Sequence, residues 1–148
     1  MKTPSTPLVE ALRRTADRLE RPETRYSWSH QGNCNCGHLA QTLTRLAPEQ
    51  IHAWAIEKQG DWADKAVERC GVSEHPIDAV LSAMSGAGMT PTDIVHLERL
   101  SHPDVLALLP AGQRWLQRNR REDVVWYMRA WADLLQAREL ARFERLLV

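Results

Sequence analysis

Four side chains of the kinds that bind transition metals lie within nine residues of one another, at His30, Cys34, Cys36 and His38. Cysteine sulfur and histidine nitrogen are ligands that zinc and iron take in proteins. The spacing differs from that of a zinc finger, in which two ligand pairs are separated by a dozen or more residues. We therefore predict a zinc or iron site held by Cys34, Cys36 and His38, with His30 as a further candidate ligand.

One short loop would be strained if it supplied all four ligands, although Gly32 and Gly37 would allow it to bend around an ion. We therefore expect a helix that packs over the loop to supply the rest. The available candidates are His75, Asp78, Asp93 and His96. Asp93 and His96 lie one helical turn apart on the same face; the alternative for this pair is an acid that caps a helix and a histidine without a metal. Catalysis would require an open coordination position, which the sequence does not show.

The same segment permits a thiol site without a metal. Cys36 would lie in the first turn of a helix, where the backbone N–H groups and the helix dipole stabilise a thiolate. His30 or His38 would act as general base, and Gln31 would help to bind an oxyanion. A redox role is a further possibility, since Cys34 and Cys36 could close into a small, strained disulfide that is readily reduced. A thioredoxin-like oxidoreductase is disfavoured, because the chain has neither Cys-x-x-Cys nor an alternating β/α pattern.

Tyr26 and Trp28, followed by Cys36, Leu39 and Gln41, give this segment a resemblance to the nucleophile region of the NlpC-type, papain-like cell-wall peptidases. The resemblance implies a cysteine nucleophile at Cys36. It covers about 16 of the 148 residues, and two glycines and an acid of the family pattern are replaced. That family carries its catalytic histidine on β-strands, whereas this chain predicts helices, so we do not assign the family.

A structural role for the cysteines is the third interpretation. Buried free cysteines behave as small apolar side chains, and the Asn-Cys-Asn-Cys-Gly segment would then be an ordinary turn into a helix. Cys70 shares the apolar face of a predicted helix with Ala66 and Val67, which indicates a core position. Under this interpretation the protein is an interaction module rather than an enzyme.

The composition is that of an ordinary globular protein, with 43% apolar and 26% charged residues. Nineteen basic residues balance nineteen acidic ones, so we expect neither a nucleic acid nor an anionic lipid as partner. No stretch approaches the roughly 20 apolar residues that cross a membrane. The absence of a signal-like segment and the odd count of three cysteines predict the reducing cytoplasm.

Helical periodicity and helix-start signals recur along the whole chain, and no segment alternates with the period of a strand. We predict a single all-α domain over 1–148 with seven to nine helices. The predicted starts lie near residues 7, 36, 48, 62, 76, 91 and 103, with a short helix through Trp115 and Leu116. Asn35 would cap the helix that starts near residue 36. A long C-terminal helix follows, which Asn119 and Glu122 would cap.

The apolar face of this last helix changes side along its length. Its first half has one apolar stripe, formed by Val124, Met128, Trp131 and Leu135. Arginines continue that face at Arg138, Arg142 and Arg145. The apolar residues have then moved to Leu140, Phe143 and Leu147. A helix on a single core keeps one stripe, so the end of this helix meets either a different helix of the same domain or a second copy in a homodimer.

Overall fold

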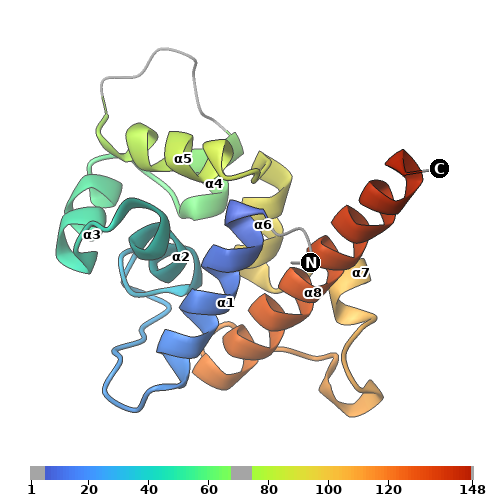
Figure 1. The fold of residues 1–148 in the computed structure, drawn as a ribbon. Coiled ribbons are helices and arrows are strands. Elements are labelled where there is room, and N and C mark those ends of the chain that lie inside the picture. The colour runs from blue at the N-terminus through green and yellow to red at the C-terminus, as the bar shows by residue number, and fades with distance from the viewer. Residues whose placement is uncertain (1–5, 68–74, 148) are drawn as a thin grey trace.

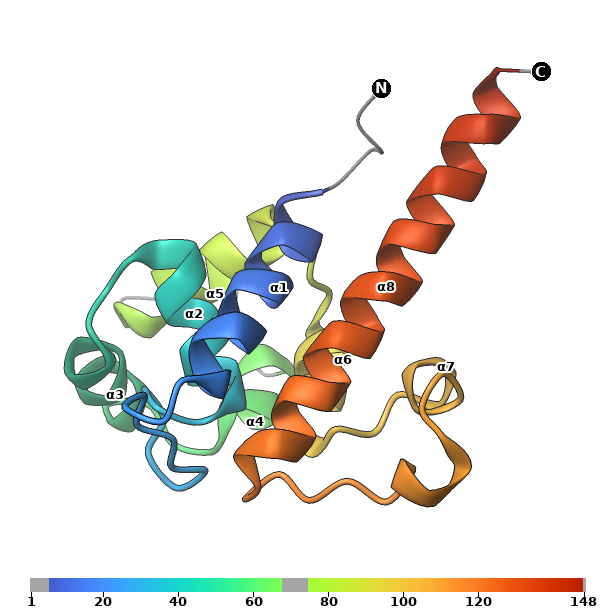
Figure 2. The ribbon, with the colours of Figure 1, turned by 60° about the horizontal axis from the view of Figure 1, so that its bottom comes forward.

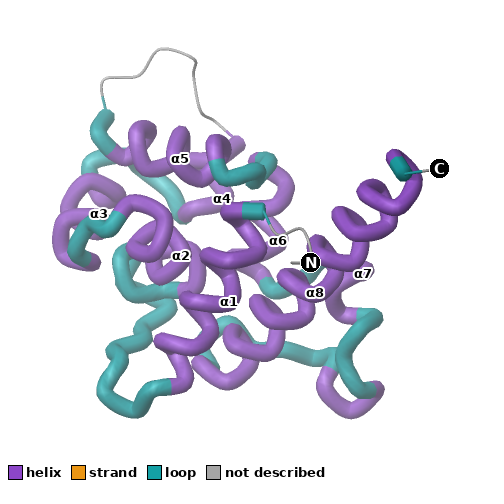
Figure 3. Tube along the Cα trace, in the orientation of Figure 1, coloured by secondary structure: helices purple, strands orange, loops and turns teal. Residues whose placement is uncertain are grey.

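The structure is a computed structural model that describes residues 6–67 and 75–147. This part of the chain contains helices and loops but no strand (Figure 1, Figure 3). The α-helices are α1 (Pro7–Glu20), α2 (Asn35–Thr44), α3 (Pro48–Ile56), α4 (Trp62–Val67), α5 (Ile77–Gly86), α6 (Pro91–Arg99), α7 (Pro103–Leu106) and α8 (Arg121–Leu146), with a short 3₁₀ helix at Ala111–Gln113. The predicted all-α class and long C-terminal helix are confirmed.

The helix starts follow from local side-chain chemistry. The Oγ1 atom of Thr6 accepts a hydrogen bond from the Val9 amide at 3.2 Å, and Pro7 occupies the first position of α1, where no amide hydrogen is needed. At α6, Thr90 and Asp93 form a reciprocal capping box, with hydrogen bonds of 3.1 Å and 2.9 Å. These two starts lie where the sequence predicts them.

Three predicted features of the helices are wrong: one start, one short helix and one cap. Helix α2 begins one residue earlier than predicted, with Cys34 rather than Asn35 as its cap. The residues around Trp115 and Leu116 are not helical, because the preceding turn closes as a 3₁₀ helix and the chain then continues in an irregular conformation. Helix α8 has Arg120 as its cap, without the predicted side-chain hydrogen bond.

Helix α2 occupies the centre of the fold and packs against α1, α3, α5 and α6. Helix α4 packs on α6, and α1 lies along α8 in roughly the opposite direction (Figure 2). One cluster of buried apolar side chains runs through these helices. The loop before α2 is therefore held on the core by the helices around it.

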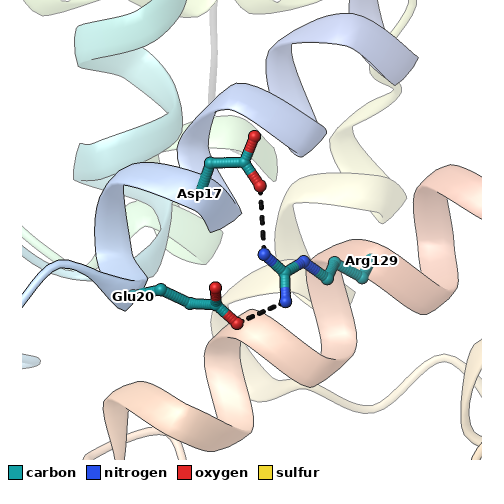
Figure 4. Close-up of polar contacts among 3 residues, drawn as sticks. All are labelled: Asp17, Glu20 and Arg129. Carbon is teal, nitrogen blue, oxygen red and sulfur yellow. Dashed lines mark hydrogen bonds and ion pairs between the residues drawn. The ribbon is translucent and has the colours of Figure 1, made fainter.

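Charged side chains join α1 to the middle of α8 at the surface. The guanidinium group of Arg129 lies between Asp17, at 3.0 Å, and Glu20 (Figure 4). Arg13 forms a second pair with Asp133 at 3.1 Å. These pairs are solvent-exposed, so each adds little stability, and the two helices are held together mainly by the apolar side chains between them.

The last third of α8 leaves the body of the protein. Within the described chain, no residue of α8 beyond Ala132 is buried. Figures 1 and 2 both show the final turns running past every other helix. Leu146 and Leu147 are 76% and 69% exposed, and Leu140 is exposed as well. The apolar stripe predicted for this end therefore meets no other helix in the described part of the chain.

Candidate functional site

Two glycines allow the 30–38 segment to pack tightly. A Cβ atom at Gly32 would lie 1.9 Å from the carbonyl oxygen of Pro48, and one at Gly37 would lie 2.4 Å from that of Gln31. Neither glycine has a positive φ angle. The glycines are therefore needed for close approach of backbone to backbone, and not for the bend that the sequence suggests.

Cys34, rather than Cys36, occupies the start of α2. Its sulfur accepts a hydrogen bond from the Gly37 amide at 3.4 Å, and the thiol donates to the Gln31 carbonyl oxygen at 3.7 Å. Burial raises the pKa of Cys34 to about 12, and the nearby charge of Glu98 adds to the effect of burial although the Gly37 amide opposes it. The thiol is therefore protonated at neutral pH.

Cys36 lies in the first turn of α2 and has no exposed surface. Its thiol donates to the carbonyl oxygen of Ile94 at 3.8 Å. Burial raises its pKa well above that of a free cysteine, and the neighbouring Cys34 raises it further. These surroundings are those of a structural cysteine and not of an activated nucleophile.

His38 is held as a neutral ring. Its Nε2 atom lies 2.7 Å from the carbonyl oxygen of Arg25, to which it donates, and Nδ1 accepts from the Arg18 guanidinium at 3.3 Å. Burial lowers the pKa of His38 to about 4. Both ring nitrogens are thus already occupied by protein groups.

His30 turns its ring inward to its own loop. Its Nδ1 atom accepts hydrogen bonds from the Gly32 and Asn33 amides, each at 3.1 Å. The ring stacks on that of His52, with 4.0 Å between the centroids. In turn, His52 Nδ1 accepts from the Gln31 amide at 3.0 Å. His30 therefore caps a turn.

The four predicted metal ligands each have a different protein partner. Among the described residues, no three histidine, cysteine, aspartate or glutamate side chains come together as a metal-binding group. Cys70, predicted to lie in the core, is outside the described residues. The metal site stays a prediction to which the geometry adds no support.

The helix-borne candidates also have other roles. Asp93 belongs to the capping box, and Asp78 forms a half-buried ion pair with Lys58 at 3.1 Å. The Nδ1 atom of His96 lies 2.9 Å from a serine hydroxyl, and His75 is exposed. For Asp93, the alternative of a helix-capping acid describes its contacts.

Gln31 connects several segments through hydrogen bonds. Its carbonyl oxygen accepts from the Trp62 indole at 3.0 Å, and its side-chain oxygen accepts from Lys65 at 2.9 Å. Its amide donates to His52, as described above. The segment thus joins α3 and α4 to the start of α2.

A buried polar cluster lies beside this segment, between α4 and α6. The Oε2 atom of Glu98 accepts from the Trp62 amide at 2.7 Å, and Lys65 is completely buried. Among the residues that the structure describes, no donor reaches Glu98 Oε1. Burial and, to a smaller extent, the neighbouring Asp61 raise the pKa of Glu98 to about 7. A protonated Glu98 can donate to the Asp61 carboxylate, whereas an ionised one leaves Oε1 unpaired.

The sequence carries a signal for this cluster that our predictions missed. Glu98 lies on the face of α6 that Ile94 and Leu97 bury, and Lys65 lies on the buried face of α4 with Trp62. A charged residue at such a position requires a buried partner. Helical periodicity predicts that both residues are buried, but it does not predict which groups they contact.

A groove of about 840 Å³ lies elsewhere, along α8. It is bordered by α1 and by Leu108 and Trp126. Its acidic and basic residues nearly balance, and Arg129 is already paired with α1. The groove therefore indicates no particular ligand.

No described helix is both long and apolar enough to cross a membrane. Comparison with known proteins gives no match to a family model, to a curated protein or to a solved structure. Function must therefore be argued from the contacts and surfaces of this chain.

Proposed function

We propose that the protein is a non-catalytic interaction module that forms a homodimer through the end of α8. One observation carries the proposal: an apolar stripe on a helix that extends beyond the body of the protein. Within the described chain, Leu140 and Leu147 of this stripe are exposed and Phe143 is half-buried. The thiols of Cys34 and Cys36 are buried, and the imidazoles of His30 and His38 are hydrogen-bonded to protein groups. These contacts support a catalytic role less than a structural one.

The stripe has the spacing of a helix-pairing seam. Leu140, Phe143 and Leu147 follow one another at intervals of three and four residues, as in the apolar positions of a coiled coil. Contiguous exposed apolar residues on a helix mark interaction surfaces more often than scattered single ones do. We therefore expect a second helix to pack along this seam.

The charges beside the seam favour an antiparallel pair. Glu139 and Leu146 flank it on one side, and Glu144 and Ala137 flank it on the other. In a parallel pair, Glu139 of one copy would face Glu144 of the other, and like charges repel. In an antiparallel pair, each glutamate faces an apolar residue, and the two bodies lie at opposite ends of the seam. This is the two-fold arrangement of a homodimer.

The seam is short, so the dimer should be weak. A stable interface buries about 800 Å² on each partner, and a few apolar side chains on two to three turns cover less than that. We expect monomer and dimer to exchange, with the dimer fraction rising with protein concentration.

Truncation after Ala137 tests the proposal, because it removes the seam and leaves every buried residue of α8 in place. Size-exclusion chromatography with light scattering, at concentrations up to about 1 mM, should give a rising mass for the full chain and a constant monomer mass for the truncated one. Equal masses at every concentration would show that the seam does not pair.

Point variants distinguish pairing through the seam from association through any exposed apolar side chain. Leu140→Asp and Leu147→Asp should each lower the dimer fraction, because they place a charge inside the seam. Leu108→Asp is the matched control, since Leu108 is an exposed leucine that does not belong to the seam. If Leu108→Asp lowers the dimer fraction as much as the seam variants do, the contact is not the one proposed.

A further inference from the structure

A pocket of about 530 Å³ lies where three segments distant in the sequence meet. Its lining residues are Trp28, Arg99, Leu116, Gln117, Arg118 and Asn119. The volume is within the range of small-molecule sites. The lining includes two arginines and no acidic residue, so its own charge is positive. Asp123, which does not line the pocket, accepts a hydrogen bond from the Gln117 amide at 2.8 Å.

An aromatic ring and a guanidinium group are already paired in this pocket. The Arg118 guanidinium carbon lies 5.1 Å from the centroid of the Trp28 ring, and Trp28 is 52% exposed. The Tyr26 hydroxyl donates to the carbonyl oxygen of Arg118, which holds the two segments together. The ring and the charge are therefore positioned before any ligand arrives.

The two arginines of the pocket are available for an anion. Neither Arg99 nor Arg118 takes part in the ion pairs formed among residues 6–67 and 75–147. A guanidinium group presents parallel N–H donors that match the oxygens of a phosphate or carboxylate. Exposed tryptophan next to arginine is also the composition of binding hot spots.

We propose that this pocket binds a small anion that carries a planar ring. The indole of Trp28 would stack on the ring, Arg99 and Arg118 would hold the oxyanion, and the Gln117 and Asn119 side chains would hydrogen-bond polar atoms of the ring. A nucleotide and an aromatic carboxylate both have this chemistry. The pocket shares no residue with the α8 seam, so the two proposals stand or fall separately.

Calorimetric titration of the full chain with two matched pairs tests the site and identifies the source of the anion. The pairs are adenosine monophosphate with adenosine, and benzoate with benzamide. In at least one pair, the anion should bind about 10-fold or more tightly than its neutral counterpart. The pair that shows this difference tells whether the ligand is a phosphate or a carboxylate.

Two variants and two controls test whether the anion binds in this pocket. Trp28→Ala and Arg118→Gln should each weaken binding by about 10-fold, because they remove the stacking face and one oxyanion donor. Trp126→Ala and Arg114→Gln should leave it unchanged, since these residues do not line the pocket. Circular dichroism of the exposed-site variants confirms that they fold.

Three results would overturn the proposal. The first is no saturable heat for either anion up to about 10 mM, which is weaker than a specific site gives. The second is inorganic phosphate binding as tightly as the best ring-bearing anion, since the ring would then add nothing. The third is equal loss of binding in the pocket variants and the controls.

Discussion

Replacing Glu98 with glutamine should remove a pH-dependent weakness of the protein. Glu98 is buried between α4 and α6 beside Asp61, and burial raises its pKa from 4.5 to about 7. Between these two pH values, the folded protein holds a proton that the unfolded chain has released. The free energy of unfolding therefore falls as pH rises through this window, and the loss is complete above pH 7.

The size of this effect follows from the pKa difference. One pKa unit corresponds to about 1.4 kcal/mol, so the full difference would amount to about 3.4 kcal/mol. Local relaxation around the buried carboxyl group lowers the cost of ionising it, and we expect about 2 kcal/mol. Glutamine resembles the protonated acid, because its oxygen can accept from the Trp62 amide while its amide group donates to Asp61.

Urea unfolding at several pH values between 4.5 and 8 measures this prediction. Glu98→Gln and the natural protein should be about equally stable at pH 4.5, and the variant should be more stable by about 2 kcal/mol at pH 8. The comparison between the two proteins removes the contributions of other titrating groups. Glu57→Gln is the control, since Glu57 is exposed, and its stability difference should not change with pH. A constant difference for Glu98→Gln would refute the reasoning.

The remaining predictions concern the 30–38 segment. Burial lowers the pKa of His38 to about 4; the unfolded chain takes up this proton first, so His38 should reduce stability as pH falls from 6.5 towards 4, a slope that His38→Gln should remove in urea unfolding. Cys34 and Cys36 should react slowly with iodoacetamide at pH 7 and rapidly after unfolding, because burial raises both pKa values; rapid alkylation of Cys36 at pH 6, located by peptide mass spectrometry, would instead support a nucleophile. Gly32→Ala should destabilise the protein by about 2 kcal/mol or more in thermal unfolding, since the new methyl group would overlap a backbone carbonyl. The predicted metal site requires about one zinc or iron per chain in elemental analysis of untagged protein and loss of that metal in Cys36→Ala, and a value near zero would remove it.

The fold could be predicted because its signals are local. Thr6 and Pro7 define the start of α1, and Thr90 with Asp93 defines that of α6, through contacts within one turn of helix. The start of α2 was missed by one residue because two cap residues compete there: Cys34 accepts the amide hydrogen bond that Asn35 was expected to accept. Asn35 instead donates to the carbonyl oxygens of α6 at 2.9 and 3.0 Å, a long-range contact that has no local signal.

The candidate site was predictable only as a set of residue types. Sequence spacing shows that two cysteines and two histidines are close along the chain, but it does not show where each side chain points. Cys36 points to α6 and His38 points to the loop before α2, because residues two apart on a helix project roughly 200° from each other. Glu98 was missed because its partner is far away in the sequence. The Trp62 amide, at the start of α4, reaches it only when the chain folds.

The hydrogen bonds of Gln31 have a consequence for how the protein would lose its structure. Gln31 joins residues more than 20 positions away, at His52, Trp62 and Lys65, and one of these bonds requires an unprotonated imidazole. Protonation of His52 in mild acid would break the bond from the Gln31 amide and loosen the attachment of α3 before the core itself opens. As pH falls, the Gln31 amide should therefore be the first to lose its protection against hydrogen exchange, relative to the intrinsic exchange rate at each pH. The segment that contains Cys34 and Cys36 would then connect the helices of the native fold and be the first part of it to open.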